Sequence, residues 1–179
     1  PDKFFGTRDN KAFEVLSTSL DNKAIFLATE EALFQDGPIT TISYNSHVRI
    51  IRYSSDLKPI NEVAYQLEKV EALKGFDGTP GENGLVDIAA IDENSFYSME
   101  RSYLPSANKN VIRIFKCTIT DKTTDVAKLE SLKDASFIGV QKELVADLDD
   151  FLIKMNPKSL DNVEGITFGP NLPNGHKSL

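Results

Sequence analysis

Three acidic side chains recur along this chain at a nearly constant spacing. Glu14, Asp87 and Glu164 each lie near the start of a segment in which apolar residues alternate, and 73 and 77 positions separate them. If a repeated unit places them at equivalent positions around one axis, their carboxylates converge. Two carboxylates about 6 Å apart, in an effective dielectric near 20, repel each other by roughly 3 kcal/mol. Such a group requires a cation, an arginine or raised pKa values.

Calcium is the cation that such a set of oxygen ligands suits, because it is a hard ion that takes about 6–8 of them. The acidic balance of the chain, with net charge −7, is compatible with cation binding. We therefore expect Glu14, Asp87 and Glu164 to bind calcium, which could polarise a phosphoryl oxygen and activate water. The alternative is that Glu14 and Glu164 cap strand ends or accept hydrogen bonds from backbone amides.

Glu100 and Arg101 are adjacent opposite charges within an otherwise apolar and aromatic run. Charges rarely occupy the middle of a strand without a partner or a function. Because arginine can bind phosphate bidentately, we take both residues as candidate catalytic residues. The alternative is that they form ion pairs that lock neighbouring structural units together. The two histidines, His47 and His176, form no recognisable nucleophile–base arrangement, and no G-x-S-x-G motif is present, so a serine esterase is not indicated.

The elements that would position these residues repeat as well. Residues 12–31 and 84–103 share one layout, in which a strand-like arm, a turn and an aromatic arm follow one another. The turns fall at 21–22 and 92–94, where Asp and Asn tolerate the backbone angles of a hairpin. A third opening of the same kind occurs at 162–169. A period of about 75 residues with strand content indicates a repeated β unit.

Four strand-like segments follow one another within each period. The hairpins are followed by runs at 47–53 and 61–68 in the first period and at 111–119 and 142–148 in the second. Helix competes with strand from residue 61 onward, because its apolar residues also fit helical spacing.

We interpret the remaining segments as connections between the strands. We expect short helices near 126–132 and 149–155 and a connecting loop at 75–84. The glycines of that loop lack the strand–loop–helix context of a phosphate-binding loop.

The predicted fold class is therefore all-β, with β-propeller blades of four antiparallel strands, and a β-sandwich is the alternative. We expect one partial propeller domain over 1–179, with blades at about 12–69 and 84–148 and the start of a third at about 160–179. Closed propellers have about 4–8 blades, and two blades leave long unpaired edges, so we expect this chain to be part of a longer polypeptide.

The aromatic residues and the single cysteine are assigned to packing. Cys117 is expected in the core, and packing between blades is expected for Phe13, Phe26, Phe96, Phe115 and Phe168.

Composition excludes several classes of partner. The sequence pI of about 4.9 argues against binding of nucleic acid or anionic membranes, which requires basic faces. One cysteine allows no internal disulfide and no cysteine-based metal site. No apolar run approaches the length of about 18 residues that a membrane span needs.

Three segments resemble a known family: NKAFEVL, SMERSYLPSANKNVIRIFKCTI and LDNVEGITFGPNLPNGHKSL. They look most like the cyanobacterial and plant or algal members of the phytase-like family called esterase-like activity of phytase. Two positions depart from its pattern, since Val15 stands where glycine is usual and Asp87 stands where glutamate is usual.

The resemblance implies a β-propeller, an extracytoplasmic location (periplasm, secreted or thylakoid lumen) and phosphoesterase or esterase activity on a phosphate-ester substrate. It also implies calcium, which related propeller phytases use. The alternative is a non-enzymatic propeller scaffold that binds another protein or a larger complex.

Overall fold

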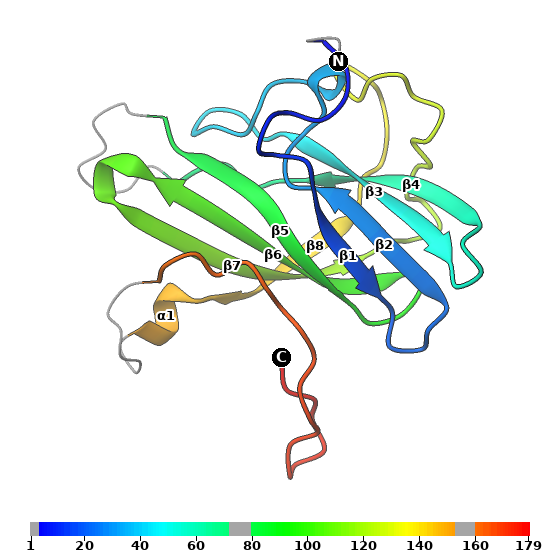
Figure 1. The fold of residues 1–179 in the computed structure, drawn as a ribbon, viewed down its shortest axis with the longest axis vertical. Coiled ribbons are helices and arrows are strands. Elements are labelled where there is room, and N and C mark those ends of the chain that lie inside the picture. The colour runs from blue at the N-terminus through cyan, green and yellow to red at the C-terminus, as the bar shows by residue number, and fades with distance from the viewer. Residues whose placement is uncertain (1–3, 72–79, 153–159) are drawn as a thin grey trace.

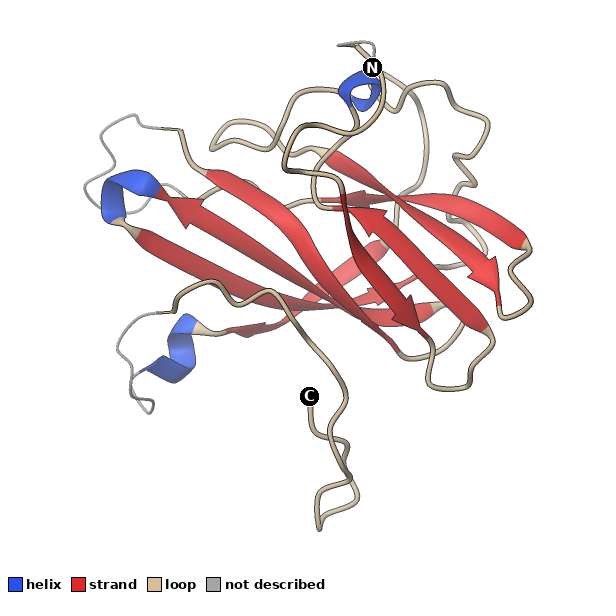
Figure 2. Cartoon of the chain, in the orientation of Figure 1, coloured by secondary structure: helices blue, strands red, loops and turns tan. Residues whose placement is uncertain are grey.

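A computed structural model describes residues 4–71, 80–152 and 160–179 (Figure 1). Its described part consists mainly of strands (Figure 2). They form two four-stranded antiparallel sheets whose strand order follows the sequence. Sheet 1 contains β1 (Phe13–Thr18), β2 (Ala24–Thr29), β3 (His47–Ser54) and β4 (Pro59–Gln66). Sheet 2 contains β5 (Glu82–Ala90), β6 (Ser95–Leu104), β7 (Lys109–Thr118) and β8 (Gln141–Asp147). The helical turns are η1 (Phe34–Asp36), η2 (Pro105–Ala107) and α1 (Asp149–Leu152).

The strands predicted in the first two periods and their hairpin turns are confirmed, whereas the third opening at 162–169 forms no strand. At the first turn Asn22 has a φ of 57°, a left-handed conformation that asparagine tolerates. At the second turn the Asp92 carboxylate accepts hydrogen bonds from the Asn94 amide and the Ser95 hydroxyl. Residues 61–66 are strand and not helix, because Val63 and Tyr65 alternate into the core. Two expectations fall partly outside the described residues: the loop at 75–84 and the helix at 149–155, of which α1 is the described part.

The helix expected near 126–132 is wrong. This part of the connection between β7 and β8 crosses to the outer edge of sheet 1, where the Val126 amide donates to the Glu62 carbonyl. Farther along, the Val140 amide donates to the Ala64 carbonyl. The connection therefore covers the otherwise unpaired edge of β4, and its polar backbone groups bond across to sheet 1 instead of within a helix.

The two sheets share one apolar core. Val15, Phe26 and Ile50 of sheet 1 meet Phe96 and Phe115 of sheet 2, and all five are buried. The ring centroids of Phe26 and Phe96 are 5.5 Å apart. Cys117 is also buried in this core, as expected. Phe13 is not, since 56% of its surface is exposed.

Matching β-bulges show which residues of the two sheets are equivalent. The bulge of β1 lies between Phe13 and Val15, and the bulge of β5 lies between Leu85 and Asp87. The ladders therefore align Phe13 with Leu85, Glu14 with Val86, and Val15 with Asp87. The expectation that Glu14 and Asp87 are equivalent is wrong by one residue.

The same registers show that opposite faces of the two sheets pack against each other, as they do between stacked repeated units. They align Ile25 with Phe96 and Phe26 with Tyr97. Phe96 faces sheet 1, and we call its side of each sheet the front face. Tyr97 lies on the back face, where its ring is 6.2 Å from that of Phe168.

The back face of each sheet is covered by the segment that follows it in the chain. The back face of sheet 1 carries Phe26 and is covered by sheet 2. The back face of sheet 2 is covered by residues 160–166, through Val163 and Ile166. No strand is assigned within 160–179, and the two sheets do not close into a ring. Among the described residues no helix is long and apolar enough to cross a membrane.

A buried ion pair fixes the crossing connection on sheet 1. The Arg49 guanidinium donates to the Asp36 carboxylate through Nε at 2.7 Å and Nη2 at 2.9 Å. It also donates to the carbonyls of Val126 and Leu129 at 3.1 and 2.8 Å. Asp36 in turn accepts the Leu132 amide at 2.8 Å. One guanidinium thus joins β3, η1 and the connection.

Replacing Arg49 tests this junction. Arg49→Met should destabilise the protein by about 3–5 kcal/mol, because it leaves the Asp36 carboxylate buried without its cation. Lys58→Met is the control, since the pair formed by Lys58 and Asp56 is largely exposed and water screens it, so its loss should change stability little. Urea unfolding measures both changes. Equal small losses for the two variants would contradict the role given to Arg49.

Strand β5 approaches the end of β2 closely at a glycine. The Leu85 amide donates to the Glu30 carbonyl at 2.9 Å. A Cβ on Gly84 would lie 2.5 Å from both Cγ and Oε1 of Glu30. Glycine is therefore required for the Glu30 side chain to remain where it is.

Gly84→Ala should force the Glu30 side chain to move and destabilise the protein by about 1–3 kcal/mol. Gly165→Ala is the matched control, because no atom lies within 4 Å of the position its Cβ would take. Thermal unfolding of both variants measures the difference. If Gly84→Ala melts at the wild-type temperature, the close approach described here does not exist.

Candidate functional site

Charged side chains gather where β5 begins beside the end of β2. We call this group the charged cluster; it consists of Lys11, Glu14, Glu30, Glu82, Arg101 and Glu164. The Lys11 ammonium lies 2.7 Å from Glu30 and 3.1 Å from Glu82. The Arg101 guanidinium lies 3.2 Å from Glu164 and 3.9 Å from Glu30. Four carboxylates thus surround two cations.

Glu30 is the centre of the charged cluster. Only 3% of its side chain is exposed, and it lies between Lys11 and Arg101. Burial tends to lower the pKa of Lys11, but hydrogen bonds and charge attraction from Glu30 and Glu82 outweigh burial and raise that pKa. Lys11 therefore stays charged over the physiological range and holds Glu30 in place.

Glu14 is the carboxylate of the charged cluster whose pKa is raised. It occupies the unpaired position of the β1 bulge. Partial burial raises the pKa of its carboxyl group, and repulsion from Glu30 and Glu164 raises it further, while Lys11 and Arg101 oppose the change. Glu14 is therefore a more basic carboxylate than an ordinary glutamate, and it lies within electrostatic range of two cations.

One hydrogen-bond donor of Arg101 has no partner among the described residues. Its Nη1 donates to the Asn162 side-chain oxygen at 3.1 Å. Its Nε is buried and has no hydrogen-bond partner in the described part of the chain. Of its two carboxylate neighbours, Glu30 is buried, whereas 48% of the Glu164 side chain is exposed. Glu164 is therefore the partner that an incoming anion can replace.

Glu100 lies on the opposite face of β6, because adjacent residues of a strand point to opposite sides. Its buried carboxylate accepts hydrogen bonds from the Tyr65 hydroxyl at 2.6 Å, Lys142 at 2.6 Å, Asn83 at 2.7 Å and the Glu68 amide at 2.9 Å. This set joins both sheets. Burial, with the nearby Glu100 charge, raises the pKa of Tyr65 well above its usual value. Glu100 and Arg101 therefore do not share one site, and catalysis by Glu100 stays a prediction.

Asp87 bonds to the backbone on both of its oxygens. Oδ1 accepts the Ile88 amide at 2.7 Å and Oδ2 accepts the Ile166 amide at 2.9 Å. It thereby ties β5 to the segment that covers the back face of sheet 2. The register places Asp87 one position away from the residue equivalent to Glu14.

The structure does not gather Glu14, Asp87 and Glu164 into a set of metal ligands. Among the described residues no three His, Cys, Asp or Glu side chains form a group that could hold a metal ion. Lys11 and Arg101 already supply positive charge between the carboxylates. The side chains present thus do not fit one calcium ion held by all three acids, and calcium stays a prediction.

Sequence reasoning missed Lys11, Glu30 and Glu82 as site residues. Lys11 and Glu30 are 19 positions apart and meet only because the β1–β2 hairpin folds back on itself. One sequence signal could have pointed to Glu30, because it and Arg101 each lie near the end of an aromatic arm. The strand ladders show that these two positions are equivalent. An acid and a base at equivalent positions of consecutive units are suited to pair across the stack.

Comparison with known proteins gives one match. A family model described as Phytase-like: Esterase-like activity of phytase matches residues 1–179. Neither the curated proteins nor the solved structures contain a match. This family suggests a hydrolase of the phosphatase or esterase type. Since the match covers the whole sequence, the chain belongs to the phytase-like family.

Proposed function

We propose that this chain carries the site of a phosphomonoester hydrolase and that the charged cluster is that site. The observation that carries the proposal is the Arg101 guanidinium, whose buried Nε is unpaired in the described part of the chain, within electrostatic range of Glu14, a carboxylate of raised pKa. The family match supports a phosphatase or esterase reaction. We also propose that the two sheets are consecutive propeller blades, which their front-to-back stacking supports, and that the protein is extracytoplasmic.

Arg101 binds the phosphoryl oxygens in this proposal. Its planar fork matches two phosphate oxygens, and such charge-assisted pairs are about twice as strong as neutral hydrogen bonds. The incoming phosphate displaces the exposed Glu164 carboxylate, while Glu30 remains as the buried partner. Lys11 lies on the other side of Glu30 and adds positive potential at the same place.

Glu14 acts as the general base. It takes a proton from a water molecule, whose oxygen attacks phosphorus while the bond to the leaving oxygen breaks. The leaving oxygen then takes a proton from solvent. General bases work best when their pKa lies near the working pH, so a raised glutamate pKa suits this role. No step in this mechanism depends on a metal ion.

A non-enzymatic scaffold is the second candidate. The observation that favours it is the front face of sheet 1, where Phe13 and Leu16 are 56% and 71% exposed. Exposed apolar groups of this size commonly mark contacts with other protein surfaces. A protein that shows no hydrolysis of simple phosphate or carboxylate esters would support this candidate over the hydrolase.

Arg101→Lys tests the phosphate-binding role. It should lower kcat/KM for p-nitrophenyl phosphate by about 10²-fold, because lysine cannot reproduce the bidentate fork. The melting temperature should change little. Arg113→Lys is the matched control, since Arg113 pairs with Asp147 and Glu71 away from the charged cluster. A loss of stability in Arg101→Lys without a specific loss of kcat/KM would make Arg101 a structural residue only.

The pH dependence tests Glu14. A general base must be deprotonated, so kcat/KM should rise with pH through the raised pKa of Glu14, above the ordinary glutamate range. Glu14→Gln should remove both this rise and most of the activity, whereas Glu143→Gln, on the exposed face of β8, should keep both. An unchanged pH profile in Glu14→Gln would assign the base to another group.

A further inference from the structure

We propose that the charged cluster selects a phosphate monoester whose organic part carries a positive charge, as in an aminoalkyl phosphate. This inference rests on the proposed function, because it names the class of substrate for that same site. The observation behind it is an imbalance of charge. Four carboxylates and two cations give the charged cluster a formal charge of −2 when Glu14 is deprotonated, as a general base must be.

This imbalance opposes an ordinary phosphate ester, which is largely a dianion near neutral pH. Arg101 attracts the phosphate, but Lys11 is already shared between Glu30 at 2.7 Å and Glu82 at 3.1 Å. The Glu164 carboxylate stays nearby after the phosphate has displaced it from Arg101. A substrate that brings its own positive charge relieves this repulsion, whereas one with a second negative group increases it.

Glu82 is the residue placed to bind that positive charge. The β5–β6 register pairs Gly84 with Arg101, and Glu82 lies two positions earlier on β5, so Glu82 and Arg101 are diagonal neighbours on one face. Diagonal neighbours across two strands are roughly 7–8 Å apart. A phosphate at Arg101 and an ammonium group at Glu82 can therefore belong to one small molecule with a short carbon spacer.

The exposure of the carboxylates leads to the same assignment. Only 3% of the Glu30 side chain is exposed, whereas 44% of the Glu82 side chain and 48% of the Glu164 side chain are exposed. In the described part of the chain the Glu82 carboxylate pairs with Lys11 alone. An ammonium group can therefore approach Glu82 from solvent while Lys11 stays on the buried Glu30.

Calorimetric titration of the native protein with three esters of matched size tests this proposal. The first, 2-aminoethyl phosphate, carries an ammonium group; propyl phosphate carries a methyl group in its place, and carboxymethyl phosphate carries a carboxylate. The amino ester should bind at least about fivefold more tightly than the propyl ester, which is the size of effect that partly exposed pairs produce. The carboxymethyl ester should bind most weakly. Raising the salt concentration to about 0.5 M should reduce the preference, because salt screens such charges.

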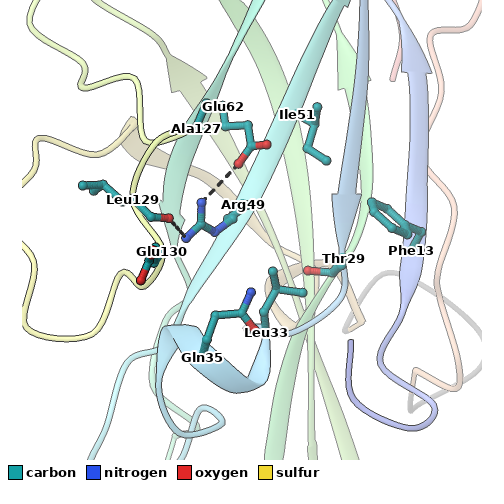
Figure 3. A pocket seen from close by; sticks show the side chains of 10 residues that line it. All are labelled: Phe13, Thr29, Leu33, Gln35, Arg49, Ile51, Glu62, Ala127, Leu129 and Glu130. Atoms are coloured by element: carbon teal, nitrogen blue, oxygen red, sulfur yellow. Dashed lines mark hydrogen bonds and ion pairs between the residues drawn. The ribbon is translucent and has the colours of Figure 1, made fainter. Parts of the chain in front are cut away.

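Glu82→Gln tests the residue assigned to the ammonium group. It keeps the shape of the side chain and removes its charge, so the affinities for the amino and propyl esters should come within about twofold of each other. Glu130→Gln is the matched control, which should keep the wild-type preference. Glu130 is an exposed acid of the crossing connection, and it lines a pocket with Arg49 and Glu62 on the front face of sheet 1, away from the charged cluster (Figure 3).

The outcomes separate this inference from the proposed function. Equal affinities of the wild type for the three esters, or no binding of any of them, would overturn the inference. A preference that Glu82→Gln leaves unchanged would also overturn it, since another group would then bind the ammonium. Hydrolysis of p-nitrophenyl phosphate without the preference would reject this inference and leave the hydrolase standing. The preference without hydrolysis of any ester would support the binding site and reject the hydrolase.

Discussion

The packing of the back face of sheet 1 on the front face of sheet 2 is the interaction on which the rest of this structure depends. Phe26, Val48 and Ile50 from one sheet and Phe96 and Phe115 from the other exclude water from a single core. Apolar burial of this kind is the main driving force of folding. The polar contacts between the sheets are directional, and they fix how the two faces align.

This alignment brings the charged cluster together. Glu30 pairs with Lys11 within the first hairpin, and because β5 lies against the end of β2, it also approaches Arg101 of sheet 2. Gly84 leaves the room that the Glu30 side chain occupies. The cluster is thus a product of the stack and not of any single strand. It places a carboxylate of raised pKa, Glu14, within electrostatic range of a guanidinium with an unpaired donor, and on this arrangement the proposed hydrolysis of a phosphate ester depends.

Much of the fold could be predicted from the sequence, because strand alternation and turn residues are local signals. The hairpins around Asn22 and Asp92 and the strand character of β4 follow from them. The crossing connection could not be predicted, since the hydrogen bonds of Val126 and Leu129 to Arg49 join residues about 80 positions apart. Local apolar spacing indicated a helix there, and these tertiary contacts override it.

The candidate site could be predicted only in part, for a related reason. Matching the acidic residues aligns Glu14 with Asp87, but the strand registers make Glu14 equivalent to Val86, one residue earlier. Glu100 and Arg101 are neighbours in sequence and lie on opposite faces, so one side chain joins the sheets and the other joins the cluster. Lys11 and Glu30 meet only because the hairpin brings them together.

Arg101 is proposed to bind an anion that displaces the Glu164 carboxylate. Calorimetric titration of inorganic phosphate into wild-type protein and into a Glu164→Gln variant tests it most directly. The variant should bind phosphate more tightly, by about tenfold, because neutralising Glu164 removes the competing carboxylate from Arg101. Phosphate binding that is unchanged or weaker in the variant would show that Glu164 does not compete with an anion for Arg101.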